Sequence, residues 1–442
     1  MFIERLALTN FRCYRDVGVD LPRGQAVIVG GNAQGKTSLL EAVFVAGATR
    51  SPFAAAERQV VRWGAGEDDG LPYSQVSVVL QRSDGRHTVD VVYVQEVTGG
   101  NGAAAAVGQG RITKRYRVDD RPCRAMAALG VLKIVLFAPQ DLALVDGPPS
   151  ARRRYLDTLL CLLDRDYCRS LARYKRVLAQ RNHLLRRLRG GPGDLDELAF
   201  WDDRLAQDGA KVLAWRTAAV EELASHAAPL HGALAGGAGK LSLAYRASVA
   251  GEAGTRARGE DCWSPQAHQP APAPEPSRTD DAPTEAAGVG PPLGSGAGGN
   301  LNAAPAQLAE AFAEALRAAR RVDIARGVTT VGPQRDDIEF RLDGADVRAF
   351  GSRGQQRTVA LATKLAEAQV MEDRGDAPVV LLDDVLSELD ASRRRFLVKH
   401  LAADRQTLLS TTDLDTVPAG FRGEAVVLRV EGGNIQINGS AR

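Results

Sequence analysis

One segment near the start of the chain, VIVGGNAQGKTSLLEA, constrains the fold more than any other. It contains the spacing Gly30-x-x-x-x-Gly35-Lys36-Thr37. An apolar run precedes this spacing and an amphipathic run follows it, so a strand should lead into a glycine-rich loop and then a helix. The glycines let the loop curl until its backbone amides, from about Asn32 to Thr37, point at phosphate groups. The sequence therefore predicts an α/β fold built around a phosphate-binding loop.

The loop and the first turn of the following helix supply the predicted nucleotide site. We expect the positively charged Lys36 side chain to contact the transferred phosphate of ATP, and the Thr37 hydroxyl to bind Mg²⁺. An isolated motif can match by chance, but the flanking strand and helix patterns favour nucleotide binding. The predicted nucleotide-binding residues are Gly30, Gly31, Asn32, Ala33, Gln34, Gly35, Lys36, Thr37 and Ser38.

Two acidic residues end a second apolar run, in the stretch APVVLLDDVLSELD. In phosphate-loop NTPases a buried strand delivers a carboxylate to its C-terminal end, where the carboxylate holds the Mg²⁺ water shell. We expect Asp383 to have this metal role. Asp384 is placed to orient or deprotonate the attacking water, and with Lys36 it is the predicted catalytic group. A helix N-cap explains one aspartate here but explains two poorly.

A second loop with glycines, FGSRGQQRTVALATKL, begins at Phe350 with small and polar residues and then becomes helical. Glycine, serine and glutamine at the start of a helix usually indicate an anion-binding site. The alternative is a simple helix N-cap at Ser352. The chain would then have two anion sites, separated by about 300 residues.

The order of these features resembles that of ABC-type ATPases. The stretch Ser352, Arg353, Gly354 and Gln355 is similar to their Leu-Ser-Gly-Gly-Gln signature motif, with Arg353 in place of a glycine. In that class the signature motif caps the γ-phosphate bound to an opposing subunit, and two ATP molecules are enclosed in a head-to-tail dimer. The resemblance therefore implies that this loop serves the nucleotide of a second copy, in an ATP-dependent homodimer.

Composition agrees with a protein of the cytoplasm. The chain has 442 residues, of which 44% are hydrophobic and 25% are charged, and a formal net charge of +2. Its five cysteines are scattered without a CxxC pair, so neither a disulfide framework nor a structural zinc site is expected. No apolar run approaches the roughly 20 residues of a membrane helix. The start MFIERLALTNFRCYRD lacks a signal-peptide core.

The two ends of the chain form one predicted α/β unit interrupted by helices. We expect an ABC-type P-loop ATPase head with a mixed sheet, formed by residues 1–148 and 329–442, and an inserted helical arm domain at 149–328. Residues 99–110 are of low complexity. Residues from about 250 to 300 are rich in Pro, Gly, Ala and Ser, and we expect a disordered insert there.

Helical periodicity fills the predicted arm. Leucine and tyrosine residues recur every three or four positions from Leu156 to Leu178 and predict one long helix. A second helix is expected from about Asp194 to Ala224, folded back as a hairpin after the turn RGGPGD, and a third at about 305–321. In the predicted head, two strands around the turn SDGR are expected in the stretch YSQVSVVLQRSDGRHTVDVVYVQEV.

The first arm helix is strongly basic. The segment from Ala151 to Arg189 holds twelve Lys and Arg residues against three Asp. Double-stranded or gapped DNA is the obvious partner for such a segment. A solvated helix face is the alternative, and Arg152 and Arg153 can also brace the junction between head and arm. The candidate DNA contacts are Arg152, Arg153, Arg154, Arg165, Arg169, Arg173, Lys175 and Arg176.

Six stretches in order resemble the RecF family of bacterial recombination-repair proteins. They are LTNFRCYRD, GGNAQGKTSLLEA, FAPQDLALVDGPPSARRRYLD, VGPQRDD, SRGQQRT and LLDDVLSELD. The resemblance implies an ATP-driven dimer that binds DNA near single-strand gaps, with weak ATP hydrolysis as a switch. It also implies roles in replication restart and the SOS response, and RecR, RecO and RecA as partners.

The chain departs from the family pattern at three positions. Gln140 stands where the family usually has Glu, Gln334 where it usually has His, and Gly351 where it more often has Ala. The change at Gln334 puts a role of that side chain in doubt.

Other functional classes fit less well. A transporter ATPase subunit places its signature about a hundred residues after the phosphate loop, and an SMC-like structural ATPase needs long heptads that are missing here. A nuclease is disfavoured because the six histidines are dispersed.

Overall fold

The computed structural model describes residues 1–65, 73–96, 111–191, 195–249, 305–402 and 405–438. The insert predicted at about 250–300 and the low-complexity stretch 99–110 lie outside the described residues. None of the helices in the described ranges combines the length and the apolar character that crossing a membrane requires.

The first sheet of the head is antiparallel and comes from the N-terminal part of the chain. Its strand order is β2-β1-β4-β5-β6-β7. The hairpin expected around SDGR is present, since Tyr73 pairs with Val94 and Arg82 with Gly85. The strands are β1 (Phe2–Phe11), β2 (Tyr14–Asp20), β4 (Tyr73–Arg82), β5 (Gly85–Glu96), β6 (Arg111–Val118) and β7 (Arg121–Cys123).

The second sheet combines strands from both ends of the chain. Its order is β15-β14-β3-β13-β12-β8, parallel from β14 to β8 and antiparallel at β15. Every residue of β3, β12 and β13 is buried, as expected for a parallel sheet covered on both faces. The strands are β3 (Gln25–Val29), β8 (Ile134–Phe137), β12 (Val379–Asp383), β13 (Thr407–Thr411), β14 (Val426–Glu431) and β15 (Asn434–Asn438).

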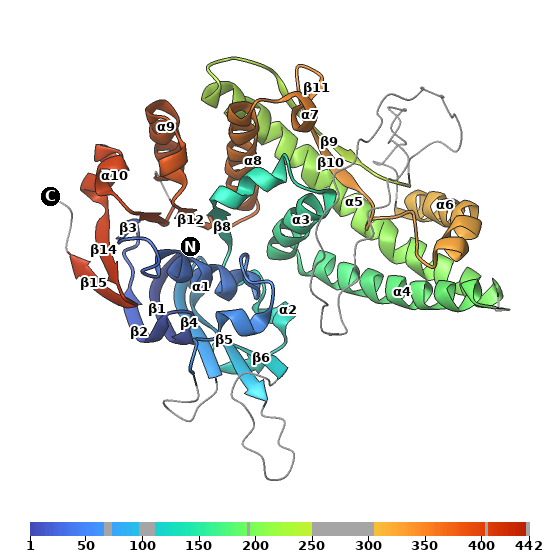
Figure 1. Cartoon of the computed structure of the whole chain (residues 1–442), viewed down its shortest axis with the longest axis horizontal. Coiled ribbons are helices and arrows are strands. Elements are labelled where there is room, and N and C mark those ends of the chain that lie inside the picture. The colour runs from blue at the N-terminus through green and yellow to red at the C-terminus, as the bar shows by residue number, and fades with distance from the viewer. Residues whose placement is uncertain (66–72, 97–110, 192–194, 250–304, 403–404, 439–442) are drawn as a thin grey trace, which may run out of the picture.

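Helix α1 (Lys36–Ala48) packs between the two sheets, against β4 of the first and β13 of the second (Figure 1). Shorter elements complete the head. They are α2 (Ala125–Ala128), α9 (Ala391–Ala402), α10 (Ala419–Glu424) and 3-10 turns at Glu57–Val60, Pro139–Leu144, Val385–Glu388 and Leu414–Thr416.

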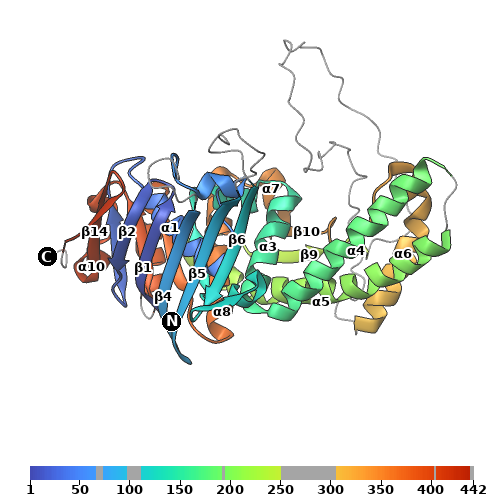
Figure 2. The same ribbon diagram turned by 90° about the horizontal axis from the view of Figure 1, so that it is seen from below.

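The arm extends to one side of the head (Figure 2). Its helices are α3 (Pro149–Leu163), α4 (Arg165–Arg189), α5 (Leu195–Leu234) and α6 (Pro305–Arg326). The prediction of a single long helix from Leu156 to Leu178 is wrong, because the helix is interrupted at Asp164, between the end of α3 and the start of α4. That residue is extended, with φ −141° and ψ 116°, and its carboxylate accepts hydrogen bonds from the amides of Asp166 and Tyr167. A side-chain N-cap therefore starts a new helix inside the periodic pattern.

A third, smaller sheet joins the arm to the C-terminal part of the head. Strand β9 (Leu241–Arg246) pairs antiparallel with β10 (Asp337–Leu342), which also pairs with β11 (Ala345–Asp346). The segment predicted as a helical arm thus also contributes a strand. Helices α7 (Val347–Phe350) and α8 (Arg353–Asp373) follow, and α5 packs along α8.

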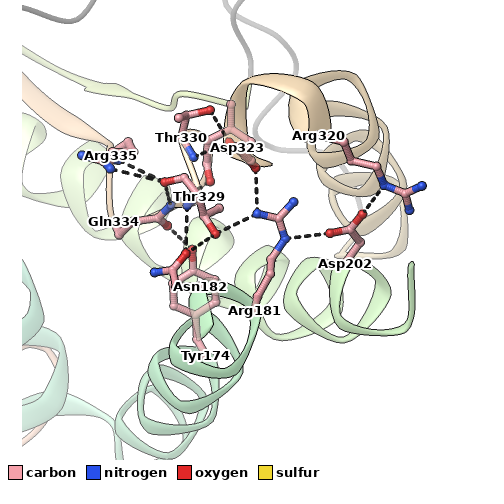
Figure 3. A network of polar contacts seen from close by, with 11 residues as sticks. Tyr174, Arg181, Asn182, Asp202, Arg320, Asp323, Thr329, Thr330, Gln334 and Arg335 are labelled. Atoms are coloured by element: carbon pink, nitrogen blue, oxygen red, sulfur yellow. Dashed lines mark hydrogen bonds and ion pairs between the residues drawn. The ribbon is translucent and has the colours of Figure 1, made fainter. Parts of the chain in front are cut away.

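A buried polar network ties the arm helices together (Figure 3). Arg181 of α4 is fully buried. Its guanidinium donates to Asp202 of α5 and to Asp323 of α6, both at 2.7 Å, and to the Thr329 hydroxyl at 2.8 Å. Arg320 adds a second cation to Asp202 at 2.7 Å. These charges neutralise one another, as buried charges must to be tolerated.

Candidate nucleotide-binding site

Three neighbouring parallel strands bring the predicted phosphate and metal residues to one edge of the second sheet. Strand β13 lies between β3 and β12. The register pairs Asp383 with Ser410, and Ser410 in turn with Ile28 of β3. Because parallel strands end at the same edge, the phosphate loop after β3 and the aspartate that ends β12 meet there.

The phosphate loop needs its two glycines for different reasons. Gly35 has φ +118°, which other residues rarely adopt, and a Cβ there would lie 2.8 Å from both Cys13 Sγ and Tyr14 Oη. Gly30 has no such angle, but a Cβ on it would lie 2.3 Å from the carbonyl oxygen of Val430. The loop is therefore packed too closely against β1–β2 and β14 for side chains at these positions.

The turn between β14 and β15 holds the loop from the other side. The amide of Gly432 donates to Gln34 Oε1 at 2.7 Å, and the amide of Gly433 donates to the Gln34 carbonyl at 3.4 Å. Almost 400 residues separate these partners. Nothing in the sequence marks this contact, because Gly-Gly between two strands predicts only a turn.

Lys36 folds back over the loop that precedes it. Its Nζ donates to the carbonyl oxygens of Gly30 and Gly31 at 2.8 and 2.7 Å. Desolvation by burial lowers the pKa of Lys36, and the nearby carboxylates of Asp384 and Asp383 oppose that shift. The ammonium group is thus held at the loop by weak acceptors, which an anionic phosphate can replace.

Asp383 is held by two hydroxyl groups. Thr37 Oγ1 donates to Asp383 Oδ1 at 2.9 Å and Ser410 Oγ donates to the same oxygen at 2.8 Å. Burial raises the pKa of Asp383, while these two hydrogen bonds lower it. Asp384 is half-buried, has φ +50° and donates its amide to Ser410 Oγ at 3.0 Å. Ser410 was missed by the sequence argument, which had no means of placing β13 beside β12.

These groups surround one cavity of about 230 Å³. It joins backbone donors, an ammonium group, a hydroxyl group and two carboxylates, which together suit a phosphate chain with a hard cation. The residues that line it are Cys13, Asn32, Ala33, Gly35, Lys36, Thr37, Ser38, Asp383, Asp384 and Ser410. None of the described residues of the signature loop is among them.

The signature loop instead faces outward. Ser352, Arg353, Gly354 and Gln355 are all exposed, whereas most of α8 from Gln356 onwards is buried. Ser352 is also a helix N-cap: its hydroxyl accepts from the Gln355 amide at 3.3 Å, and Gln355 Oε1 accepts from the Ser352 amide at 2.8 Å. The loop therefore forms a helix N-cap, and the anion site predicted from the sequence would lie at this same loop.

Two of the candidate DNA contacts face inward. Arg152 is 2% exposed, donates to both carboxylate oxygens of Asp337 at 2.6 and 2.9 Å, and also donates to the carbonyl oxygen of Gly147. Its guanidinium is therefore occupied within the chain, and the prediction that Arg152 contacts DNA is wrong. Arg153 donates to the carbonyl oxygen of Asp336 at 2.9 Å. Both arginines brace the junction between α3 and β10.

The other six candidates are exposed, namely Arg154, Arg165, Arg169, Arg173, Lys175 and Arg176. Arg165, Arg169, Arg173 and Arg176 recur every three or four residues along α4, which places them on one face of that helix. Several also have partners within the chain: Arg169 pairs with Asp166 at 2.7 Å, and Arg173 lies 3.3 Å from Asp208. The Arg169–Asp166 pair is exposed on both sides and therefore weak, and the Arg173 side chain is itself 48% exposed, so both arginines stay accessible to phosphate groups.

The structure shows the surroundings of two of the three residues that depart from the family pattern, Gln334 and Gln140. Gln334 accepts a hydrogen bond from the hydroxyl of Tyr174 and donates to the carbonyl oxygen of Val331 at 2.8 Å, which places it among the polar contacts of the arm (Figure 3). Gln140 is exposed.

The chain matches known proteins over almost its whole length. Residues 2–426 match the model of the RecF/RecN/SMC N-terminal domain. The DNA replication and repair protein RecF of Chloroflexus aurantiacus is 40% identical, over 98% of this chain and 99% of its own. The chain belongs to the RecF family.

Further RecF relatives and solved structures agree. The RecF protein of Roseiflexus castenholzii is 38% identical over 98% of this chain and 99% of its own. A solved structure described as the recombination mediator RecF with ATP in the RecFOR pathway superposes with a TM-score of 0.76. It is 25% identical and covers 99% of this chain and 97% of that one. The α/β head with an inserted arm is thus the fold of RecF proteins.

Proposed function

We propose that this RecF-family chain is an ATP-driven, DNA-binding dimer of recombinational repair and replication restart. Residues 1–148 and 329–442 form its ATPase head, and 149–328 form the arm. One observation carries the proposal: the signature loop is exposed and lies outside the cavity that holds the phosphate loop of its own chain.

The phosphate cavity fits MgATP. The amides of the loop and the Lys36 ammonium group bind the phosphates, and Asn32, Ala33 and Ser38 complete the cavity wall. The Thr37 hydroxyl and the Asp383 carboxylate, 2.9 Å apart, are hard oxygen donors suited to Mg²⁺. When bound, the ion neutralises charge on the phosphates.

Hydrolysis is proposed to reset the dimer rather than to drive metabolism. Asp384 lines the cavity, follows the buried strand directly and has a left-handed backbone conformation. In this position it orients the attacking water and accepts its proton.

The signature loop closes the site of a second copy. Ser352 and the exposed start of α8 can donate hydrogen bonds from a hydroxyl group and backbone amides to an anion. These residues do not line the phosphate cavity of their own chain, so the anion would be the nucleotide of a second copy. A two-fold dimer places the loop of each copy over the nucleotide of the other. Arg353 adds a positive charge where the ABC pattern has glycine.

The arm supplies the DNA contacts. The face of α4 that carries Arg165, Arg169, Arg173 and Arg176 is suited to phosphate groups, and binding through it is independent of base sequence. By membership of the family, we propose gapped duplex DNA as the target, RecR, RecO and RecA as partners, a role in the SOS response, and the cytoplasm as the site of action.

The dimer is tested by light scattering with a non-hydrolysable ATP analogue. The parent protein should double its mass when the analogue is added. Ser352→Arg places a bulky cation in the signature loop, which forms the proposed lid over the nucleotide of the second copy. This variant should remain monomeric while still binding the analogue. Ser225→Arg, on an exposed position of α5, is the matched control and should dimerise. Dimerisation of Ser352→Arg to the same extent as the parent would rule out the proposed lid.

A further inference from the structure

The two most exposed large apolar side chains in the described ranges are both aromatic. Trp63 is 97% exposed and Phe350 is 81% exposed, whereas Leu195 and Phe200 follow at 57%. Aromatic side chains held in water are frequent anchors of protein interfaces, because they bury much apolar area at little conformational cost. Trp63 borders a groove that shares two lining residues with the phosphate cavity, and Phe350 lies two residues before Ser352 of the signature loop.

Trp63 borders a groove of about 980 Å³ that adjoins the phosphate cavity. Cys13 and Ser38 line both hollows, so the groove and the phosphate cavity are adjacent. Phe53 and Ile112 add apolar surface to its wall. The groove therefore provides an aromatic and aliphatic surface next to the nucleotide site.

The backbone that carries Trp63 is fixed. The Arg62 amide donates to the carbonyl oxygen of Asn10, and the Arg12 amide donates to that of Val60, both at 2.8 Å. These bonds attach the segment before Trp63 to the end of β1. A partner that contacts this side chain does not have to order the backbone first, which favours binding.

Phe350 is the last residue of α7, a short helix labelled near the top of Figure 1. Val347 of the same turn is buried, and its carbonyl oxygen accepts from the Gly351 amide at 2.9 Å. Ser352 follows two residues later, so the Cα atoms of Phe350 and Ser352 are at most about 7 Å apart. Wherever the lid binds, Phe350 binds beside it.

We propose that Phe350 of one copy inserts into the groove bordered by Trp63 of the second copy when ATP closes the dimer. This inference rests on the proposed function, because the lid carries Phe350 to the cavity that the groove adjoins. The two-fold symmetry of such a dimer forms the contact twice.

Charge explains why the contact depends on nucleotide. Arg58 is exposed and lines the groove, and Arg348 and Arg353 are exposed on either side of Phe350. Two positively charged surfaces repel each other at short range unless an anion lies between them. The triphosphate supplies that anion, so the aromatic contact forms only in the ATP-bound dimer.

The first test compares dimerisation of Phe350→Ala, Trp63→Ala and the double variant by light scattering with the ATP analogue. Each single change should weaken dimerisation at least about tenfold, and the double variant should be no weaker than either single one, because both remove the same contact. Binding of the analogue by the monomer should stay within about twofold of the parent. Phe200→Ala, which removes another exposed phenylalanine, is the control and should dimerise as the parent does.

The outcomes separate this inference from the proposed function. If Phe350→Ala dimerises like the parent while Ser352→Arg does not, the lid stands and the aromatic contact is wrong. If the losses from Phe350→Ala and Trp63→Ala add up, the two side chains do not meet. A monomer of Trp63→Ala with weakened analogue binding would show that the tryptophan stacks on the nucleotide itself, which also overturns the contact.

The second test uses Cys13, an exposed native cysteine that lines the groove. A short bismaleimide should link Phe350→Cys of one copy to Cys13 of the other, giving a covalent dimer on a denaturing gel only with the analogue. Adding Cys13→Ser should abolish the product. A linked dimer that forms without nucleotide, or none when scattering shows dimers, would overturn the contact.

Discussion

At the scale of single residues, the two aspartates that end β12 have different surroundings. Asp383 accepts hydrogen bonds from Thr37 and Ser410, whereas Asp384 donates its backbone amide to Ser410 and lines the cavity wall. We therefore expect Asp384→Asn to bind ATP within about threefold of the parent and to hydrolyse it at least about 100-fold more slowly, as loss of a general base does. Nucleotide titration and a single-turnover assay measure the two quantities.

Asp415→Asn is the matched control, because the side chain of Asp415 is 89% exposed and lies away from the cavity. Both quantities should be unchanged in this variant. Equal hydrolysis rates in Asp384→Asn and the parent would remove Asp384 from catalysis.

The positions of the residues at the candidate phosphate site were predictable because their spacing and flanking patterns are local. Lys36, Thr37 and Asp383 fall where the motif and the strand end place them. Ser410 was not predictable, since its role depends on β13 lying between β3 and β12. The inward-facing role of Arg152 depends on Asp337, 185 residues away, and charge along the sequence gives no sign of it.

At the scale of elements, the arm depends on Arg181 of α4. We expect Arg181→Met to lower the free energy of unfolding by about 3–5 kcal/mol, because it leaves the carboxylates of Asp202 and Asp323 buried without their shared cation. Urea denaturation followed by circular dichroism measures the change.

Arg187→Met, on the same helix, is the control. Arg187 is 59% exposed and lies 3.8 Å from Glu197, so its loss should cost about 0.5 kcal/mol or less. An equal effect of both substitutions would show that the Arg181 network adds no more than a surface pair.

Helices and strands were easier to predict than their ends. The periodic pattern from Leu156 to Leu178 continues across Asp164, since the apolar face of α3 passes directly into that of α4, and only the N-cap geometry reveals the break. Helix α5 reaches Leu234, beyond the expected end at Ala224, and passes through Pro229 on the way. Strand neighbours in the second sheet could not be read from the sequence at all.

At the scale of the whole molecule, the α4 face should set how DNA binding responds to salt. Replacing Arg165, Arg169, Arg173 and Arg176 together by Ala should weaken DNA binding and reduce the slope of log affinity against log salt by about 3 to 4, because each lost phosphate contact accounts for about 0.9. Binding titrations with linear, gapped and single-stranded DNA at several salt concentrations measure this slope.

The double variant Arg5→Ala with Arg86→Ala is the control, because both arginines are exposed on the first sheet, away from the arm. Its salt slope should equal that of the parent. An unchanged slope in the α4 variant would place the DNA site elsewhere.

The architecture of the whole chain was largely predictable because its landmarks keep a fixed order. The phosphate loop lies near one end of the sequence, and the signature loop and the aspartate strand lie near the other. This order predicts a single sheet built from both ends of the chain, and β3 and β12 do belong to one sheet. The third sheet was not foreseen, since β9 and β10 are separated by the insert and each is only six residues long.

The measurement that tests the shared site most directly is ATP hydrolysis by a mixture of two inactive variants. Lys36→Ala keeps its lid but loses its phosphate site, and Ser352→Arg keeps its phosphate site but loses its lid. A dimer of one copy of each has one complete site, so the mixture should regain up to about half of the parent rate per mixed dimer. Mixed dimers that form and yet stay inactive would contradict the account, as would full hydrolysis by Ser352→Arg alone.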